Sequence, residues 1–184
     1  PWLIVFWRSD IAKKWLMALS GLALIGFVIV HMIGNLKLFI GKADINEYAE
    51  WLRTLGHPVL PDQVVLWIMR VGLLAAVVVH IAAAASLTIT NRKARPVRYQ
   101  SRRDYAAANF ASRTMRWTGI IVLLFIIYHL LDLTWGVGNS SWRSGEVYDN
   151  IITSFQRWPV AIFYIIASLA LAFHIFHLRS VVKL

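Results

Sequence analysis

Four separate stretches of this 184-residue chain are apolar for roughly 20 residues each, the length that a helix needs to cross a bilayer. They lie at about residues 15–38, 64–90, 114–135 and 158–181. Each is too long and too apolar for an amphipathic surface helix, and none shows the period-2 alternation of a transmembrane barrel strand. The sequence therefore predicts an all-α integral membrane helical bundle with four transmembrane helices, forming a single membrane domain over residues 1–184.

The distribution of charge predicts how these helices are oriented. The formal net charge is +10, and most of the basic residues fall on the side that holds both chain ends and a loop at residues 91–113. Only Asp10 and Asp104 oppose them there, whereas basic and acidic residues are mixed on the other side. The positive-inside rule then makes both ends cytoplasmic. The basic loop suits lipid headgroups or an acidic partner equally well, and we expect no nucleic acid partner.

The outer connections carry weaker signals. The segment "INEYAEWLRTL", about residues 45–55, has apolar residues on one helical face and predicts a helix on the outer membrane surface. The loop "GVGNSSWRSGEVYDN" is rich in turn-forming residues. No internal repeat is evident, and the absence of cysteine excludes disulfides and an iron–sulfur cluster held by this chain's own thiolates.

Each predicted span contains a histidine inside its apolar stretch. These are His31, His80, His129 and His174, and His177 lies one turn beyond the last. Ionisable residues inside a membrane are rare and costly, so each is a candidate functional residue. For any single one a structural role is the commoner explanation, but four histidines, one in each span, favour a functional role.

Helical rise sorts the four histidines into two levels. His31 and His129 lie 17 and 13 residues beyond Lys14 and Arg116, which places them ~20–25 Å from the inner boundary. His80 and His174 lie 16 and 15 residues beyond Val64 and Pro159, ~22–24 Å from the outer boundary. The sequence therefore predicts an outer pair, His31 with His129, and an inner pair, His80 with His174.

A flat cofactor can bridge each pair. Bis-histidine ligation of haem b iron needs one imidazole from either side, whereas a bare metal ion would need three or four donors at each level. Asp132 is the one carboxylate near a span, so a proton or metal transport path has few stations. Arg70 is a candidate partner for a haem propionate, or it snorkels to the interface. His177 could replace His174 as ligand, contact a propionate, or point to the headgroups.

Several motifs resemble one family. "KKWLMALSGLALIGFVIVHMIGNLKLF", "INEYAEWLR", "ASRTMRWTGIIVLLFIIYHLLDLTWG" and "FYIIASLALAFHIFH" are similar to the cytochrome b membrane-anchor subunit of bacterial succinate dehydrogenase and fumarate reductase, in its single-chain b558-like form. Members usually have a fifth helix, and after the last histidine pair they read His-Gly followed by Trp-Ser. The ending "FHIFHLRSVVKL" lacks this, which leaves the role of His177 open.

The resemblance implies a multi-pass subunit of the bacterial cytoplasmic membrane that works as part of respiratory complex II. It implies flavoprotein and iron–sulfur subunits on the cytoplasmic face, with the succinate site on a partner. Electrons would pass from succinate through two b haems to a membrane quinone, which we expect to be menaquinone. By motif, the haem iron ligands are His31, His80, His129 and His174. Family variants differ in the number and type of redox centres.

The quinone site has two candidate positions. One is an outer pocket near Asn35, Lys37 and Glu47, and the other is an inner site near Ser20. Two other functions remain open at this point: a haem-free membrane anchor with a quinone site only, and a histidine-lined metal or proton transporter.

Overall fold

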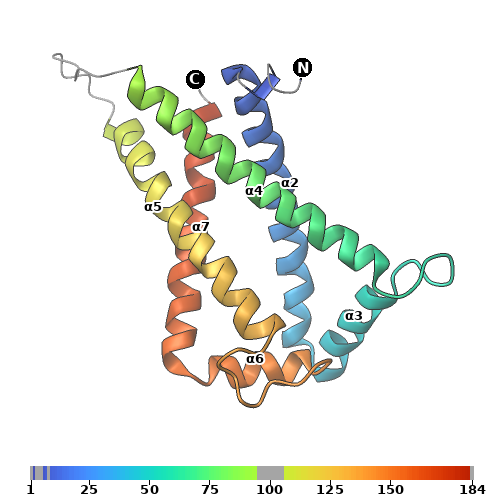
Figure 1. Ribbon diagram of the computed structural model, residues 1–184. Helices are drawn as coiled ribbons and strands as arrows, with labels where there is room; N and C mark the ends of the chain where they lie inside the picture. The colour runs from blue at the N-terminus through green and yellow to red at the C-terminus, as the bar shows by residue number, and fades with distance from the viewer. Residues whose placement is uncertain (1, 3–5, 8, 95–105, 183–184) are drawn as a thin grey trace. The chain divides into compact units, whose positions relative to one another are not determined.

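The computed structural model describes residues 2, 6–7, 9–94 and 106–182, and it leaves the side chains of residues 106–113 and 177–182 undescribed. All regular structure in this part of the chain is helical (Figure 1), which confirms the all-α prediction. Residues 95–105 of the basic loop expected at residues 91–113, and the side chain of His177, lie outside the described positions.

Four helical segments in the described residues are long and apolar enough to cross a membrane, as predicted. They arise because each apolar run is free of proline after its first turn and is rich in leucine, isoleucine, valine and alanine. The spanning helices are α2 (Asp10–Asn35), α4 (Val64–Lys93), α5 (Ala106–His129), which a π-helical turn η2 (Leu130–Thr134) continues, and α7 (Trp158–Val182).

Three shorter elements connect them. The 3-10 turn η1 (Leu36–Phe39) is followed by α3 (Lys42–Thr54), where the sequence predicts a surface helix over 45–55. Gly56, with a φ of 97°, follows the end of α3 and adopts a backbone conformation that favours glycine. The helix α6 (Val147–Phe155) lies in the loop that the sequence indicated only as turn-rich, and its buried residues Ile151 and Ser154 share one face.

Contacts divide the chain into two compact units. Unit 1 comprises Pro1–Phe39 and Glu47–Arg102, and its main feature is the packing of α2 along α4. Unit 2 comprises Ile40–Asn46 and Arg103–Leu184, and its main feature is the packing of α5 along α7. Within each unit the two long helices run antiparallel (Figure 1). The expectation of one membrane domain over residues 1–184 stays a prediction.

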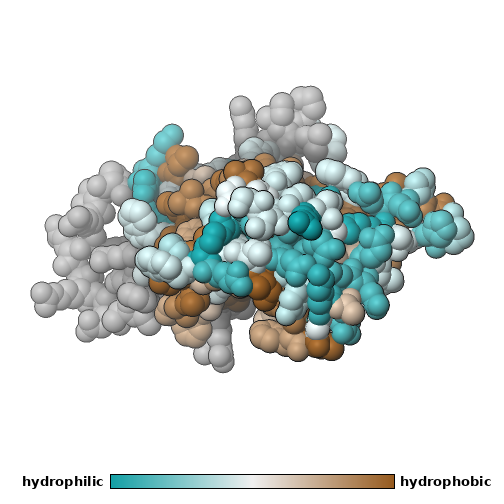
Figure 2. All heavy atoms as spheres, turned by 90° about the horizontal axis from the view of Figure 1, so that it is seen from below, coloured by the Kyte–Doolittle hydropathy of each residue, from teal (hydrophilic) through white to brown (hydrophobic). Residues whose placement is uncertain are grey.

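The surfaces of the long helices are apolar. Large exposed side chains include Leu22 and Leu74 in unit 1 and Ile165 and Leu169 in unit 2, as expected for helices whose outer faces contact lipid. Figure 2 looks onto the end that carries α6, where most of the visible side chains are hydrophilic. The chain is therefore a multi-pass membrane protein by the length and composition of its helices.

Candidate functional site

The imidazole of His80 on α4 contacts the first half of α2 in unit 1. Its Nδ1 lies 3.2 Å from the main-chain oxygen of Met17 and 3.3 Å from Oγ of Ser20. Ser20 is buried, and its hydroxyl donates its one proton to the Leu16 oxygen at 2.6 Å. Because both neighbours of Nδ1 act as acceptors, His80 donates its Nδ1–H to them.

Unit 2 contains the same arrangement built from different residues. Nδ1 of His174 on α7 lies 3.1 Å from Oγ1 of Thr118 on α5. That hydroxyl lies 3.0 Å from the main-chain oxygens of Thr114 and Met115 in the preceding turn, and its proton is donated there. Thr118 therefore accepts Nδ1–H from His174.

These hydrogen bonds select one tautomer for both histidines. A neutral imidazole that carries its proton on Nδ1 has its lone pair on Nε2, and this is the form that binds a metal through Nε2. Metal-binding histidines almost always donate the other ring N–H to a neighbouring acceptor. The sequence predicted His80 and His174 as ligands, and it did not predict that Ser20 and Thr118 orient them.

Two glycines let the imidazoles pack against the facing helix backbone. A Cβ on Gly21 would lie 3.2 Å from Cε1 of His80, and one on Gly119 would lie 3.3 Å from Cε1 of His174. Both distances are shorter than an ordinary van der Waals contact, so glycine at these positions makes room for the ring. The hydroxyl and the glycine that follows it together form the seat of each histidine.

The two seats belong to a repeated sequence pattern. The segments "MALSGLALIGFVIVH" (residues 17–31) and "MRWTGIIVLLFIIYH" (115–129) both read M-x2-[S/T]-G-x5-F-x3-H. The expectation that the chain has no internal repeat is therefore wrong. Only a few chemically important positions repeat, and the lipid-facing positions between them differ, so the pattern is seen once the contacts of Ser20 and Thr118 are known.

The repeated pattern ends on the two histidines predicted as the outer pair. The ring of His31 stacks on Phe27 with centroids 5.2 Å apart and planes 17° apart. The ring of His129 lies 5.6 Å from that of Phe125 in the equivalent position. Nδ1 of His129 also lies 3.4 Å from the hydroxyl of Tyr164 on α7.

A buried carboxylate, Asp132, lies beyond His129 in unit 2. It has no exposed surface, and it accepts hydrogen bonds from Oγ of Ser154 and Nη2 of Arg157. The hydroxyl of Tyr164 lies 3.3 Å from its Oδ2. The sequence noted Asp132 only as an isolated carboxylate near a span, because its partners come from the end of α6, the turn after it, and α7.

The π-helical turn η2 gives Asp132 this position. In η2 the N–H of Trp135 bonds to the oxygen of Leu130, five residues earlier, at 3.1 Å. The wider turn rotates the side chains that follow relative to an α-helix, and such turns often occur at functional sites. Asp132 thereby faces the buried side of α6 and α7 rather than lipid.

The described histidines fit ligation of a metal through one Nε2 atom each. In the described residues no three histidine, cysteine or acidic side chains gather closely enough to hold a bare metal ion. The fixed Nδ1–H tautomers and the glycine seats instead suit single Nε2 ligands, one from each helix. His31 and His80 belong to unit 1 and His129 and His174 to unit 2, so both pairings stay predictions.

The remaining predicted site residues lie near the outer end of unit 1. Arg70 is exposed, and its guanidinium lies 5.0 Å from the ring centroid of Trp67, one turn farther out on α4. Asn35 and Glu47 are exposed, and Nζ of Lys37 lies 5.8 Å from the Tyr48 ring. The propionate role of Arg70 and the quinone roles of Asn35, Lys37, Glu47 and Ser20 stay predictions.

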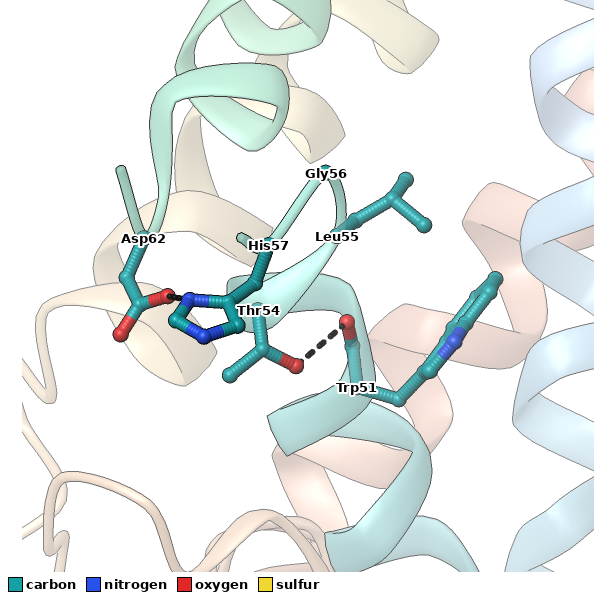
Figure 3. A pocket seen from close by; sticks show the side chains of 6 residues that line it. All are labelled: Trp51, Thr54, Leu55, Gly56, His57 and Asp62. Atoms are coloured by element: carbon teal, nitrogen blue, oxygen red, sulfur yellow. Dashed lines mark hydrogen bonds and ion pairs between the residues drawn. The ribbon is translucent and has the colours of Figure 1, made fainter. Parts of the chain in front are cut away.

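A shallow hollow of about 500 Å³ follows the end of α3 in unit 1. Figure 3 shows Trp51 and Leu55 on one side of it, with His57 and Asp62 facing each other on the other. Nδ1 of His57 lies 3.5 Å from Oδ1 of Asp62, and both side chains are largely exposed. This exposure agrees with an ordinary polar loop around His57.

Ion pairs join the start of α3 to α6 within unit 2. Nζ of Lys42 lies 2.6 Å from Oδ2 of Asp149 and 3.2 Å from Oε2 of Glu146. The hydrogen bond from Lys42 lowers the pKa of Asp149, and the bonds to Asp149 and Glu146 raise the pKa of Lys42. The side chain of Asn46 reinforces the junction by accepting from the N–H of Tyr148 at 3.1 Å.

One family model matches this chain. Residues 89–179, about half of the chain, match the succinate dehydrogenase/fumarate reductase transmembrane subunit. This range covers the end of α4 and nearly all of α5, α6 and α7, including the Thr118, His129 and His174 positions. No curated protein and no solved structure was found to match. The chain belongs to the succinate dehydrogenase/fumarate reductase transmembrane subunit family, whose members are the membrane subunits of a complex with catalytic partners.

Proposed function

We propose that the chain is the haem-binding membrane anchor and electron-transfer subunit of a bacterial succinate:quinone oxidoreductase. In this proposal it binds a flavoprotein and an iron–sulfur subunit at the cytoplasmic face of the bacterial inner membrane. The succinate site lies on a partner, so the chain acts as an enzyme only within the complex. Haem b, when bound, would supply one-electron transfer between the iron–sulfur partner and a membrane quinone.

The observation that most strongly supports this proposal is the pair of equivalent hydroxyl–imidazole contacts. Ser20 holds Nδ1 of His80 at 3.3 Å, and Thr118 holds Nδ1 of His174 at 3.1 Å. Two histidines from separate helical pairs thus have the same tautomer and the same glycine-lined seat. A structural role alone would not explain why the same hydroxyl–glycine pair is repeated at both histidines.

The four histidines, two hydroxyl residues and two glycines of this chain would have separate roles. His80 and His174 would hold the inner haem iron, and His31 and His129 the outer one. Ser20 and Thr118 would keep Nε2 of the inner ligands aimed at the metal position. Gly21 and Gly119 would let the His80 and His174 rings pack close to the backbone of the facing helix.

The quinone, which we expect to be menaquinone, would bind at the outer position near Asn35, Lys37 and Glu47. The engagement of the Ser20 hydroxyl by Leu16 and His80 leaves it less suited to a quinone oxygen than the exposed outer residues. The ammonium of Lys37 lies 5.8 Å from the centroid of the Tyr48 ring, which restricts the positions of this side chain.

The test is haem quantitation in the purified complex. A reduced-minus-oxidised spectrum with pyridine haemochromogen analysis should give two b haems per chain. The His80→Leu variant should lose the inner haem and keep most of the outer one, whereas His57→Leu, which changes an exposed loop histidine, should keep both. Absence of b-type absorption would overturn the proposal in favour of a haem-free anchor, and one haem per chain would overturn the two-pair arrangement.

A further inference from the structure

A connected row of polar side chains leads from His129 to the buried carboxylate of Asp132 in unit 2. It runs from Nδ1 of His129 to the Tyr164 hydroxyl at 3.4 Å, and from there to Oδ2 of Asp132 at 3.3 Å. We propose that Tyr164 and Asp132 are positioning residues for His129 and lower the reduction potential of the haem iron that His129 would bind. This inference rests on the proposed function.

The acceptors in this row determine where the protons lie. Asp132 forms an ion pair with Arg157, and a carboxylate in an ion pair only accepts hydrogen bonds. The Tyr164 hydroxyl therefore donates to Asp132, and its oxygen accepts Nδ1–H from His129. His129 thus has the same tautomer as His80 and His174, with the lone pair on Nε2.

The outer ligand His129 differs from the inner ligands His80 and His174 in the group that accepts the hydrogen bond of the neighbouring hydroxyl. The hydroxyls of Ser20 and Thr118 donate hydrogen bonds to neutral main-chain oxygens, whereas the Tyr164 hydroxyl donates a hydrogen bond to a carboxylate. Hydrogen bonding to a charged acceptor is stronger and polarises the donor further. A more polarised Nδ1–H makes the imidazole a better electron donor at Nε2, which favours oxidised iron over reduced iron.

Packing holds the tyrosine in place independently of its hydroxyl. The ring of Tyr164 makes edge contacts with Phe125 at 5.1 Å and Phe155 at 4.8 Å between centroids. A phenylalanine at position 164 would keep these contacts and remove only the hydroxyl. The N–H···O bond from His129 and the O–H···O bond to Asp132 are each longer than the usual range for their type, and Arg157 partly neutralises the carboxylate, so the effect should be moderate.

The experiment is an optical redox titration of the intact purified complex at fixed pH. The Tyr164→Phe variant should raise one of two b-type midpoint potentials, on the order of a tenfold change in the reduction equilibrium or about 59 mV for one electron. The other potential and the haem content should not change. The Thr118→Val variant should move the other component, because Thr118 contacts His174 instead.

Tyr128→Phe is the matched control. Tyr128 precedes His129, its ring contacts Phe163 and Tyr164, and its hydroxyl makes no hydrogen bond to any of the described residues. Removing this hydroxyl should leave both potentials unchanged. Ser154→Ala should shift the Tyr164-sensitive potential downward, because Asp132 then loses one donor and accepts more strongly from Tyr164.

Several outcomes would overturn the inference. These are unchanged potentials in Tyr164→Phe, equal shifts of both components, a shift of the component that Thr118→Val also moves, and loss of haem from Tyr164→Phe. If the Tyr164→Phe variant does not assemble, the inference is overturned when Ser154→Ala raises the midpoint potential or leaves it unchanged. A wild-type complex without b haem would instead overturn the proposed function, so the two failures are distinguishable.

Discussion

The two units of this chain share one histidine-seating pattern and differ where that pattern ends. In unit 1, α2 presents Met17, Ser20 and Gly21 to His80 on α4, and in unit 2, α5 presents Thr118 and Gly119 to His174 on α7. Three residues beyond the last histidine of the pattern, unit 1 has Gly34 and unit 2 has Asp132. The first leaves space for the ring of Tyr48, and the second anchors a buried polar cluster.

The helices α4 and α7, which carry His80 and His174, also differ at equivalent positions. Tyr164 lies ten residues before His174 on α7, and Arg70 lies ten residues before His80 on α4. Tyr164 bonds to Asp132 within unit 2, whereas Arg70 is exposed and lies over Trp67. The shared part thus contains the features that hold a histidine in one tautomer, and the divergent part contains the charged groups. The comparison suggests that the units have a common binding task and separate outer-end tasks.

The largest expected effect is at the divergent position of unit 2. Asp132→Ala should lower the free energy of unfolding by about 2–4 kcal/mol, because it leaves Arg157 and Ser154 without their buried acceptor. Thermal or denaturant unfolding of the detergent-solubilised complex measures the change. Asp149→Asn, which alters an exposed carboxylate of the same unit, is the control and should have a far smaller effect. Equal effects would show that the Asp132 cluster adds no special stability.

The corresponding position of unit 1 should respond to size instead of charge. A Cβ on Gly34 would lie 2.7 Å from Cε1 of Tyr48, so Gly34→Ala should destabilise by about 1–2 kcal/mol as the tyrosine is displaced. Gly26→Ala on the same helix meets nothing within 4 Å, and it should be neutral or stabilising by about 0.5–1 kcal/mol. The same unfolding assay compares the two, and a stabilised Gly34→Ala would contradict the close packing.

The shared pattern predicts equal effects in the two units. Ser20→Ala and Thr118→Val each remove an acceptor for a histidine Nδ1–H and should each cost about 0.5–1.5 kcal/mol. Unfolding of the two single variants, compared under identical conditions, tests this. A large difference between the single variants would break the equivalence of the seats.

The smallest effect concerns the exposed junction of α3 with α6 and depends on pH. The pKa of Asp149 is lowered, so its contribution is present above its usual pKa near 4 and is lost as pH falls through the folded value. The pKa of Lys42 is raised, so its contribution is present below its usual value and is lost as pH rises through the folded one. Between these two pH limits, the contact between Lys42 and Asp149 should not make the free energy of unfolding depend on pH.

A double-mutant cycle isolates this term. Asp149→Asn and Lys42→Gln, alone and together, should show a small coupling at neutral pH that disappears in acid. The acid limb should be flatter in the Asp149→Asn variant than in the wild type. A coupling that persists unchanged below the lowered pKa of Asp149 would mean that the contact is not ionic.

The sequence predicted the helical class and the four spans, because hydropathy over about 20 residues depends on composition alone. It also selected His80 and His174, because ionisable groups are conspicuous in apolar runs. It missed the roles of Ser20 and Thr118, since a hydroxyl in a membrane helix ordinarily bonds to its own helix. It missed α6 and the partners of Asp132, because Ser154 and Arg157 approach that carboxylate only through tertiary packing.

The hydroxyl–imidazole contacts have a consequence for how the protein is made. Each lies within one hairpin of consecutive long helices, so each hairpin can set the orientation of its own imidazole without the other. The conformational entropy of the ring is then lost while the hairpin forms, as part of folding, and no later binding step has to supply it.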